Sequence, residues 1–253
     1  RAAALDQARE VAEQLAEGVA GDRQVAACRG LHDRFRPAVE QHTLVDRHAE
    51  VVGDDEARQR LEELGDDIDA ASNVGQMSAV WGKIVLVAKS LVAEEVDARD
   101  VAAVISRELC ALTRQACILA EREIASAAPF PYAMLVLGSG GRGESLLAMD
   151  QDNAIVFAEG AAGGPEDQWF AELGRRVSTM LDAAGVPFCK GNIMASNPEL
   201  CLSAREWQAR FDRIIASTTP ANLLKSAIYF DFRVVWGDRR AADQGTSQAV
   251  PIL

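Results

Sequence analysis

The stretch from Tyr132 to Phe157, YAMLVLGSGGRGESLLAMDQDNAIVF, constrains the fold of this chain more than any other part of it. Two apolar runs, at residues 133–137 and 154–157, have the length and composition of buried strands. Between them lies a turn rich in glycine, Gly138-Ser139-Gly140-Gly141-Arg142-Gly143. The order predicts a strand, a glycine turn, the start of a helix, and a second strand that is preceded by acidic residues.

The glycine turn is a candidate phosphate site. Glycine lets the backbone adopt positive φ and approach a ligand closely. A helix that starts directly after the turn would point free backbone N–H groups at an anion. We therefore expect phosphate contacts along the turn, with the Ser139 hydroxyl and the Arg142 guanidinium as added donors; the predicted set is Gly138, Ser139, Gly140, Gly141 and Arg142. The turn lacks the Walker sequence and matches the Rossmann pattern poorly, so on its own it also fits an ordinary glycine-rich turn.

Two carboxylates strengthen the phosphate interpretation. Asp150 and Asp152 stand at i and i+2 at the start of the second predicted strand, so both side chains point to one face. Paired carboxylates repel each other unless a cation lies between them, and Mg²⁺ bound with a nucleoside triphosphate would fill that role. We predict both as metal ligands and catalytic residues. Gln151 and Asn153 alternate with them and are expected to face away into supporting hydrogen bonds. The alternative is a pair of exposed aspartates at a strand end.

These residues carry a family resemblance. Gly138-Ser139, a spacer and Asp150-x-Asp152 together resemble the active-site signature of the DNA polymerase beta-like nucleotidyltransferase superfamily. The longer string GSGGRGESLLAMDQDNAIV resembles the signal-transduction nucleotidyltransferases, which are related to the N-terminal part of protein-PII uridylyltransferase. The similarity continues into GNIMASNPELC at residues 191–201 and IYFDFRVVWGD at residues 228–238, and covers roughly residues 72–238.

The resemblance implies an activity and roles for single residues. Gly138 and Ser139 would hold the triphosphate, and Asp150 and Asp152 would bind catalytic Mg²⁺ or Mn²⁺. A nucleoside monophosphate would pass from the triphosphate to a hydroxyl of a protein or a small molecule, and pyrophosphate would leave. Arg142 and Glu144 match the family string; Arg142 is expected on phosphate, and Glu144 either orients the turn or simply begins a helix. In the full-length protein, cyclic-nucleotide-binding or CBS modules would lie upstream.

The sequence departs from the wider superfamily at one point. A third carboxylate usually stands on a neighbouring strand and helps to activate the acceptor hydroxyl. The segment expected in that place, residues 191–194, has no acid. Asn192 and Asn197 are polar candidates there, and Glu199 follows. Two alternatives stay open: transfer that depends on metal activation alone, or a catalytically silent nucleotide sensor.

We expect an α+β fold with a polymerase-beta-like core, a small mixed sheet with helices, preceded by a helical bundle or arm and followed by C-terminal helices. The expected domains are a helical region at 1–70, a nucleotidyltransferase domain at 71–205 with its sheet at about 130–200, and the start of a truncated C-terminal helical domain at 206–253.

Single elements follow from apolar periodicity and from turn and capping residues. Helices are expected from Ser72 or Asn73, after Asp97 or Asp100, and from Glu166 to a cap at Gly185. The remaining expectations are a helix break at 65–67, a third strand at 186–194, and helices at 207–216 and 220–236.

Composition restricts the partners. A net charge of −12 argues against broad binding to nucleic acid or to anionic membrane. No stretch is expected to be long and apolar enough to span a membrane. The five cysteines are odd in number and form no CxxC pair, which favours reduced, packed thiols and a cytoplasmic location. Because the chain begins at Arg1 and stops after a loop-like stretch, we expect it to be a piece of a longer protein.

Overall fold

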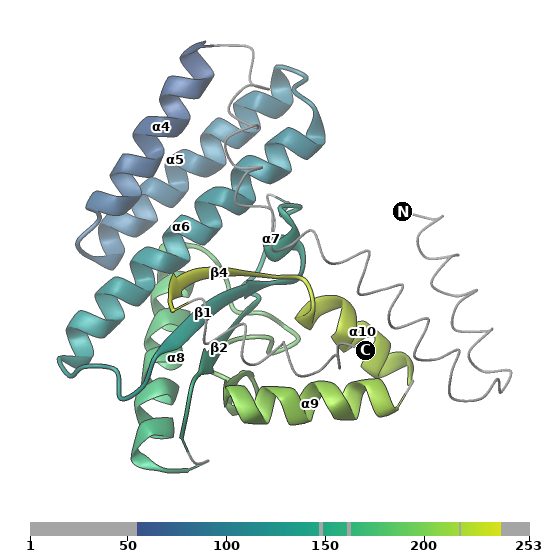
Figure 1. Cartoon of the computed structure of the whole chain (residues 1–253). Coiled ribbons are helices and arrows are strands. Elements are labelled where there is room, and N and C mark those ends of the chain that lie inside the picture. The colour runs from purple at the N-terminus through teal and green to yellow at the C-terminus, as the bar shows by residue number, and fades with distance from the viewer. Residues whose placement is uncertain (1–54, 147–148, 161–162, 218, 239–253) are drawn as a thin grey trace, which may run out of the picture.

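In the computed structural model, residues 55–146, 149–160, 163–217 and 219–238 are described. Their sheet lies between two groups of helices (Figure 1) and has the order β3-β2-β1-β4. The strands are β1 (Tyr132–Leu137), β2 (Asn153–Phe157), β3 (Cys201–Ser203) and β4 (Phe232–Gly237). β1 pairs antiparallel with both β2 and β4, whereas β2 and β3 are parallel. The prediction of an α+β fold with a small mixed sheet between helices is confirmed.

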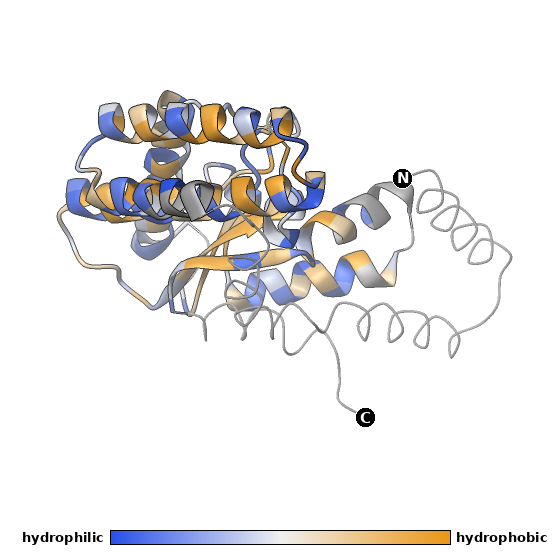
Figure 2. Ribbon diagram, turned by 90° about the horizontal axis from the view of Figure 1, so that it is seen from above, coloured by the Kyte–Doolittle hydropathy of each residue, from blue (hydrophilic) through white to orange (hydrophobic). Residues whose placement is uncertain are grey.

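Helices cover both faces of the sheet. On one side lie α4 (Asp55–Ala70), α5 (Val74–Ala93), α6 (Ala98–Ile124) and α8 (Pro165–Ala184), and on the other α9 (Ala204–Ala216) and α10 (Pro220–Tyr229). Alternate residues of β1 enter different cores: Met134 packs toward α6 and α8, and Leu135 toward α9. Every residue of β1 is therefore buried, which explains its unbroken apolar sequence. Figure 2 shows the helices striped in blue and orange, as expected for helices with one face in the core.

Local capping residues set several helix ends where the sequence predicts them. The Asn73 side chain accepts a hydrogen bond from the Gln76 N–H at the start of α5, and Asp97 does the same for Arg99 at the start of α6. Gly185 ends α8 with φ of +108°, in the left-handed region that favours glycine. These three boundaries are confirmed.

The predicted helix break at residues 65–67 is wrong. α4 continues to Ala70, and Gly65 lies inside it. A single glycine costs a helix only about 1 kcal/mol. Asp67 has a partner in Lys83 of α5, at 2.6 Å, so the acidic pair does not have to end the helix. Most of the predicted helical region at 1–70 lies outside the described residues.

Two other predicted elements are wrong. Residues 186–194 form a loop and not a third strand. The strand that pairs with β2 on the side away from β1 is β3, at Cys201–Ser203. The predicted helix at 220–236 ends at Tyr229, and the rest forms β4. Val234, Val235 and Trp236 favour a strand once an edge is available, and the edge of β1 provides one. Pairing with β1, which is distant in sequence, decides the outcome.

α5 also differs from expectation. By length and composition alone it could cross a membrane, so the expectation that no stretch approaches a span is wrong. One side of the helix belongs to the core, where its buried side chains are Met77, Val80, Trp81, Ile84, Ala88 and Leu91. A helix in the core of a folded protein can have the same length and composition, so these two features are weak evidence for a membrane span.

Candidate functional site

The glycine turn connects β1 to the acidic segment. It forms the short helix α7 (Gly138–Arg142) directly after β1. The prediction of a helix that starts after the turn is therefore wrong: Gly143 ends α7 with φ of +82°, and residues 144–146 are not helical. Gly138 has φ of +56°, a backbone conformation that residues with a side chain rarely adopt. A Cβ at this position would lie 3.5 Å from Oδ2 of Asp152. Gly141 packs on the chain just before β4, where a Cβ would lie 2.5 Å from the carbonyl oxygen of Asp231. The first glycine therefore leaves space beside a carboxylate, and the second allows close backbone packing.

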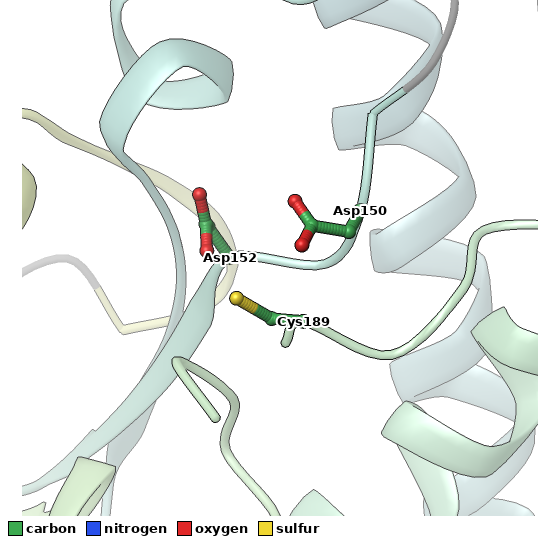
Figure 3. Close-up of side chains that lie close together, drawn as sticks. All are labelled: Asp150, Asp152 and Cys189. Carbon is green, nitrogen blue, oxygen red and sulfur yellow. The ribbon is translucent and has the colours of Figure 1, made fainter. Parts of the chain in front are cut away.

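Asp150 and Asp152 lie just before β2 and not within it, next to this turn. The N–H of Leu137 donates to the carbonyl oxygen of Asp152 at 2.9 Å, which ties the end of β1 to the acidic segment. Figure 3 shows both carboxylates with the thiol of Cys189 from a neighbouring loop. One ligand atom from each of the three lies within 4.8 Å of the others, and all three residues are half-buried. Between residues that the structure describes, no ion pair involves Asp150 or Asp152.

The pKa values of Asp152 and Cys189 show the effects of burial and of neighbouring acidic groups. Burial raises the pKa of Asp152 to about 6; a hydrogen bond from the Cys189 thiol opposes the rise, and the charge of Asp150 adds to it. Burial also raises the pKa of Cys189 to about 11. A backbone hydrogen bond involving Ile193 opposes this rise, and the neighbouring Asp152 adds to it. A bound cation would remove much of the cost of placing these groups together.

The residues between and after the aspartates fix the loop that carries Cys189. Gln151 is buried, and its side-chain Nε2 donates to the carbonyl oxygen of Val186 at 2.9 Å. Asn153 is buried as well, and its Oδ1 accepts from the N–H of Ala195 at 2.8 Å. The loop from 186 to 195 is therefore bound at both ends to the same segment that presents the carboxylates.

Arg142 lies among carboxylates of the protein. Its Nε donates to Glu144 at 2.8 Å, and its Nη1 donates to Asp231 at 2.6 Å. Asp231 is only 12% exposed; burial raises its pKa and Arg142 opposes that shift. The guanidinium thus holds the end of α7 to the residue just before β4, and a phosphate contact would have to coexist with these pairs or replace one.

The other predicted residues lie around this centre. Ser139 and Gly140 belong to α7, and the carbonyl oxygen of Ser139 accepts from the N–H of Glu144 at 2.8 Å. Asn192 is exposed with φ of +56°, and its carbonyl oxygen accepts from Nδ2 of Asn197 at 3.0 Å. Glu199 pairs with Arg210.

The structure brings Gly138, Asp150 and Asp152 together. Within the described part of the chain, the group of possible metal ligands is completed by Cys189 and not by a third carboxylate. The sequence alone does not indicate Cys189 as a ligand, because an isolated cysteine without a CxxC partner is typical of a packed apolar residue. One signal in the sequence points to it: residues 186–194 are expected beside the acidic strand, so a thiol in that segment is a candidate neighbour of the carboxylates.

Comparison with known proteins gives the family. A family model described as "Putative nucleotidyltransferase DUF294" matches residues 82–221, more than half of the chain, and includes the glycine turn, both aspartates and Cys189. No curated protein matches the chain. The family match supports the nucleotidyltransferase part of the resemblance and does not single out protein-PII uridylyltransferase. The chain therefore belongs to the DUF294 nucleotidyltransferase family.

Proposed function

We propose that this chain is a magnesium-dependent nucleotidyltransferase. It moves a nucleoside monophosphate from a triphosphate to a hydroxyl of a protein or small molecule in signalling, in the manner of protein-PII uridylyltransferase. The observation that carries the proposal is the position of Asp152 against the glycine turn, with Asp150 beside it and no cationic side chain of the described residues paired to either. Membership of a nucleotidyltransferase family supports the reaction class.

The residues fit a divalent cation. Carboxylate oxygens are the ligands that Mg²⁺ and Mn²⁺ prefer, and here two lie close together in a half-buried place with uncompensated charge. Asp150 and Asp152 would hold the metal. When bound, it would stabilise negative charge on the phosphate oxygens and on the attacking and leaving oxygens.

The rest of the site positions the triphosphate. Gly138 keeps the space between turn and carboxylate free, because a side chain at that position would enter it. Ser139 offers a hydroxyl to a phosphate oxygen. In the transfer, the acceptor oxygen forms a bond to the α-phosphorus while the bond to pyrophosphate breaks, and the acceptor proton passes to solvent. Positioning and charge stabilisation provide most of the catalysis in such a reaction.

A transfer assay tests the proposal. Each α-labelled nucleoside triphosphate is incubated with the chain, Mg²⁺ and candidate protein or small-molecule acceptors, and both labelled product and pyrophosphate are measured. Asp150→Asn and Asp152→Asn should each lower the rate by about a hundredfold or more. Glu159→Gln is the matched control, since it removes an exposed carboxylate just beyond the other end of β2. Retained transfer in both aspartate variants would overturn the assignment of the metal site.

One observation favours a second candidate, a catalytically silent nucleotide sensor. Within the described residues, the third member of the group is a thiol and not a carboxylate that could help to activate the acceptor. Calorimetry separates the two functions: a sensor binds a triphosphate with Mg²⁺ and releases no pyrophosphate with any acceptor.

A further inference from the structure

We propose that Cys189 is a third protein ligand of the carboxylate site and gives it selectivity for thiophilic divalent cations, Zn²⁺ above all. The inference rests on the metal site of the proposed function and deepens it by naming the cations that the site accepts besides Mg²⁺. The geometry points to it first: Sγ of Cys189 and one oxygen each of Asp150 and Asp152 lie within 4.8 Å of one another. The three side chains come from two separate segments and point toward a common space (Figure 3).

The loop keeps the thiol in this place. Besides its two anchors to Gln151 and Asn153, it closes a turn in which the N–H of Asn192 donates to the carbonyl oxygen of Cys189 at 2.9 Å. The N–H of Cys189 faces Sδ of Met194 at 3.4 Å. The position of the thiol is therefore fixed by backbone contacts on both sides and by the buried residues that alternate with the aspartates.

The donor set decides which cation fits. Zn²⁺ binds thiolate sulfur at about 2.3 Å and carboxylate oxygen at about 2.0–2.2 Å, usually with four ligands. Donor atoms within 4.8 Å of one another can surround one such ion after small side-chain rotations. Mg²⁺ prefers oxygen ligands and keeps several waters, so it would use the two carboxylates and leave the thiol protonated. Three protein ligands leave the fourth position of Zn²⁺ open to water or a phosphate oxygen.

Binding through the thiol involves no redox change. Cys189 gives its proton to solvent, and a sulfur lone pair forms the bond to the metal. Because Zn²⁺ and Mg²⁺ share Asp150 and Asp152, the two cations compete. Zn²⁺ binds more tightly, and the Cys189 ligand increases the difference.

Cd²⁺, a spectroscopic substitute for Zn²⁺, tests the proposal with the whole chain. Titration should give the ultraviolet charge-transfer band of a thiolate–Cd²⁺ bond, and Cys189→Ser should abolish that band. Calorimetry with Zn²⁺ alone should show affinity weakened by about tenfold or more in Cys189→Ser, while Mg²⁺ affinity changes by less than about twofold. Cys110→Ser, which alters another half-buried thiol outside the group, is the matched control and should leave band and affinity unchanged. A band of undiminished strength in Cys189→Ser would overturn the proposal.

A second measurement needs no variant. Zn²⁺ should slow alkylation of Cys189 by iodoacetamide, measured by peptide mass spectrometry, relative to the rate with Mg²⁺; equal rates would also overturn the proposal. Failure of the proposed function gives a different pattern. If Zn²⁺ protects the thiol but no triphosphate is turned over, the thiol ligand stands and the transferase does not. If transfer depends on both aspartates while Zn²⁺ leaves the thiol unprotected, the reverse holds.

Discussion

The glycine turn and the acidic segment are neighbours, yet they differ in how fully their polar groups are satisfied. In the turn, Gly141 packs on the chain before β4 and Arg142 binds Glu144 and Asp231. In the acidic segment, Asp150 and Asp152 approach each other, and their described neighbours provide no cationic partner. The turn is therefore stabilised by the protein itself, whereas the acidic segment is held in place against its own repulsion. This contrast is typical of a scaffold next to a ligand site.

The largest expected effect tests whether the glycine turn is tightly packed against the rest of the protein. Gly141→Ala places a Cβ 2.5 Å from the backbone oxygen of Asp231 and 3.0 Å from Cα of Phe232, so α7 and β4 must move apart. We expect a loss of about 3 kcal/mol in the free energy of unfolding, measured by urea denaturation. Gly82→Ala is the control: Gly82 lies in α5 with no atom within 4 Å of a Cβ, and the change should stabilise by about 0.5–1 kcal/mol. Equal effects would show that the turn is not tightly packed.

The next effect concerns the support beneath the acidic segment. Asn153→Ala removes the acceptor of the buried Ala195 N–H. We expect a loss of about 2 kcal/mol in the free energy of unfolding, because a buried donor stays unpaired. Asn197→Ala is the control at a more exposed hydrogen bond just after the loop and should cost about 1 kcal/mol or less. If Asn153→Ala were as mild as its control, Asn153 would not anchor the loop.

The two regions also differ in how far the sequence predicts them. The turn, the strand before it and the aspartates after it lie within one short stretch, and local rules of periodicity and glycine conformation are enough to order them. The caps at Asn73, Asp97 and Gly185 are local in the same sense.

The parts that were missed depend on contacts between segments distant in sequence. β4 has a strand-like composition, but only pairing with β1 distinguishes it from the end of a helix. The loop at 186–195 takes its shape from side chains of Gln151 and Asn153, and that shape brings Cys189 to the carboxylates. The spacing of residues along the sequence does not predict this contact between Cys189 and the carboxylates.

A smaller effect tests whether the carboxylates of the acidic segment lack a favourable partner in the fold. The pKa of Asp152 in the folded protein is about 6, above its ordinary value of 3.8. The folded state therefore binds a proton more readily than the unfolded state between these values, and stability falls as pH rises from about 4 to 6. Asp152→Asn removes this cost. We expect the metal-free variant to be more stable by about 1 kcal/mol above pH 6, since solvent screens part of the charge, and no more stable below about pH 4.

Thermal and urea unfolding at several pH values, with a chelator present, measure this gain. The same variant should lose metal binding, so stability and function change in opposite directions at one residue. A variant less stable than the parent at about pH 7.5 would mean that the carboxylate already has a favourable partner in the fold, and the contrast between the two regions would disappear.

The smallest expected effect concerns Arg142. Its role decides whether the polar groups of the turn are satisfied by the protein alone. A double-mutant cycle with Arg142→Ala and Asp231→Asn should give a coupling of about 0.5 kcal/mol in the free energy of unfolding, because the guanidinium side chain is 38% exposed and partly solvated. If Arg142 only joins α7 to β4, both variants should change the KM for the triphosphate to a similar, small extent. If it contacts phosphate, Arg142→Ala alone should raise the KM by about tenfold, because Asp231→Asn leaves the cation in place. In that case Arg142 binds the nucleotide as well as Glu144 and Asp231. The turn would then gain a further contact when nucleotide binds, and its ion pairs alone would not describe its role.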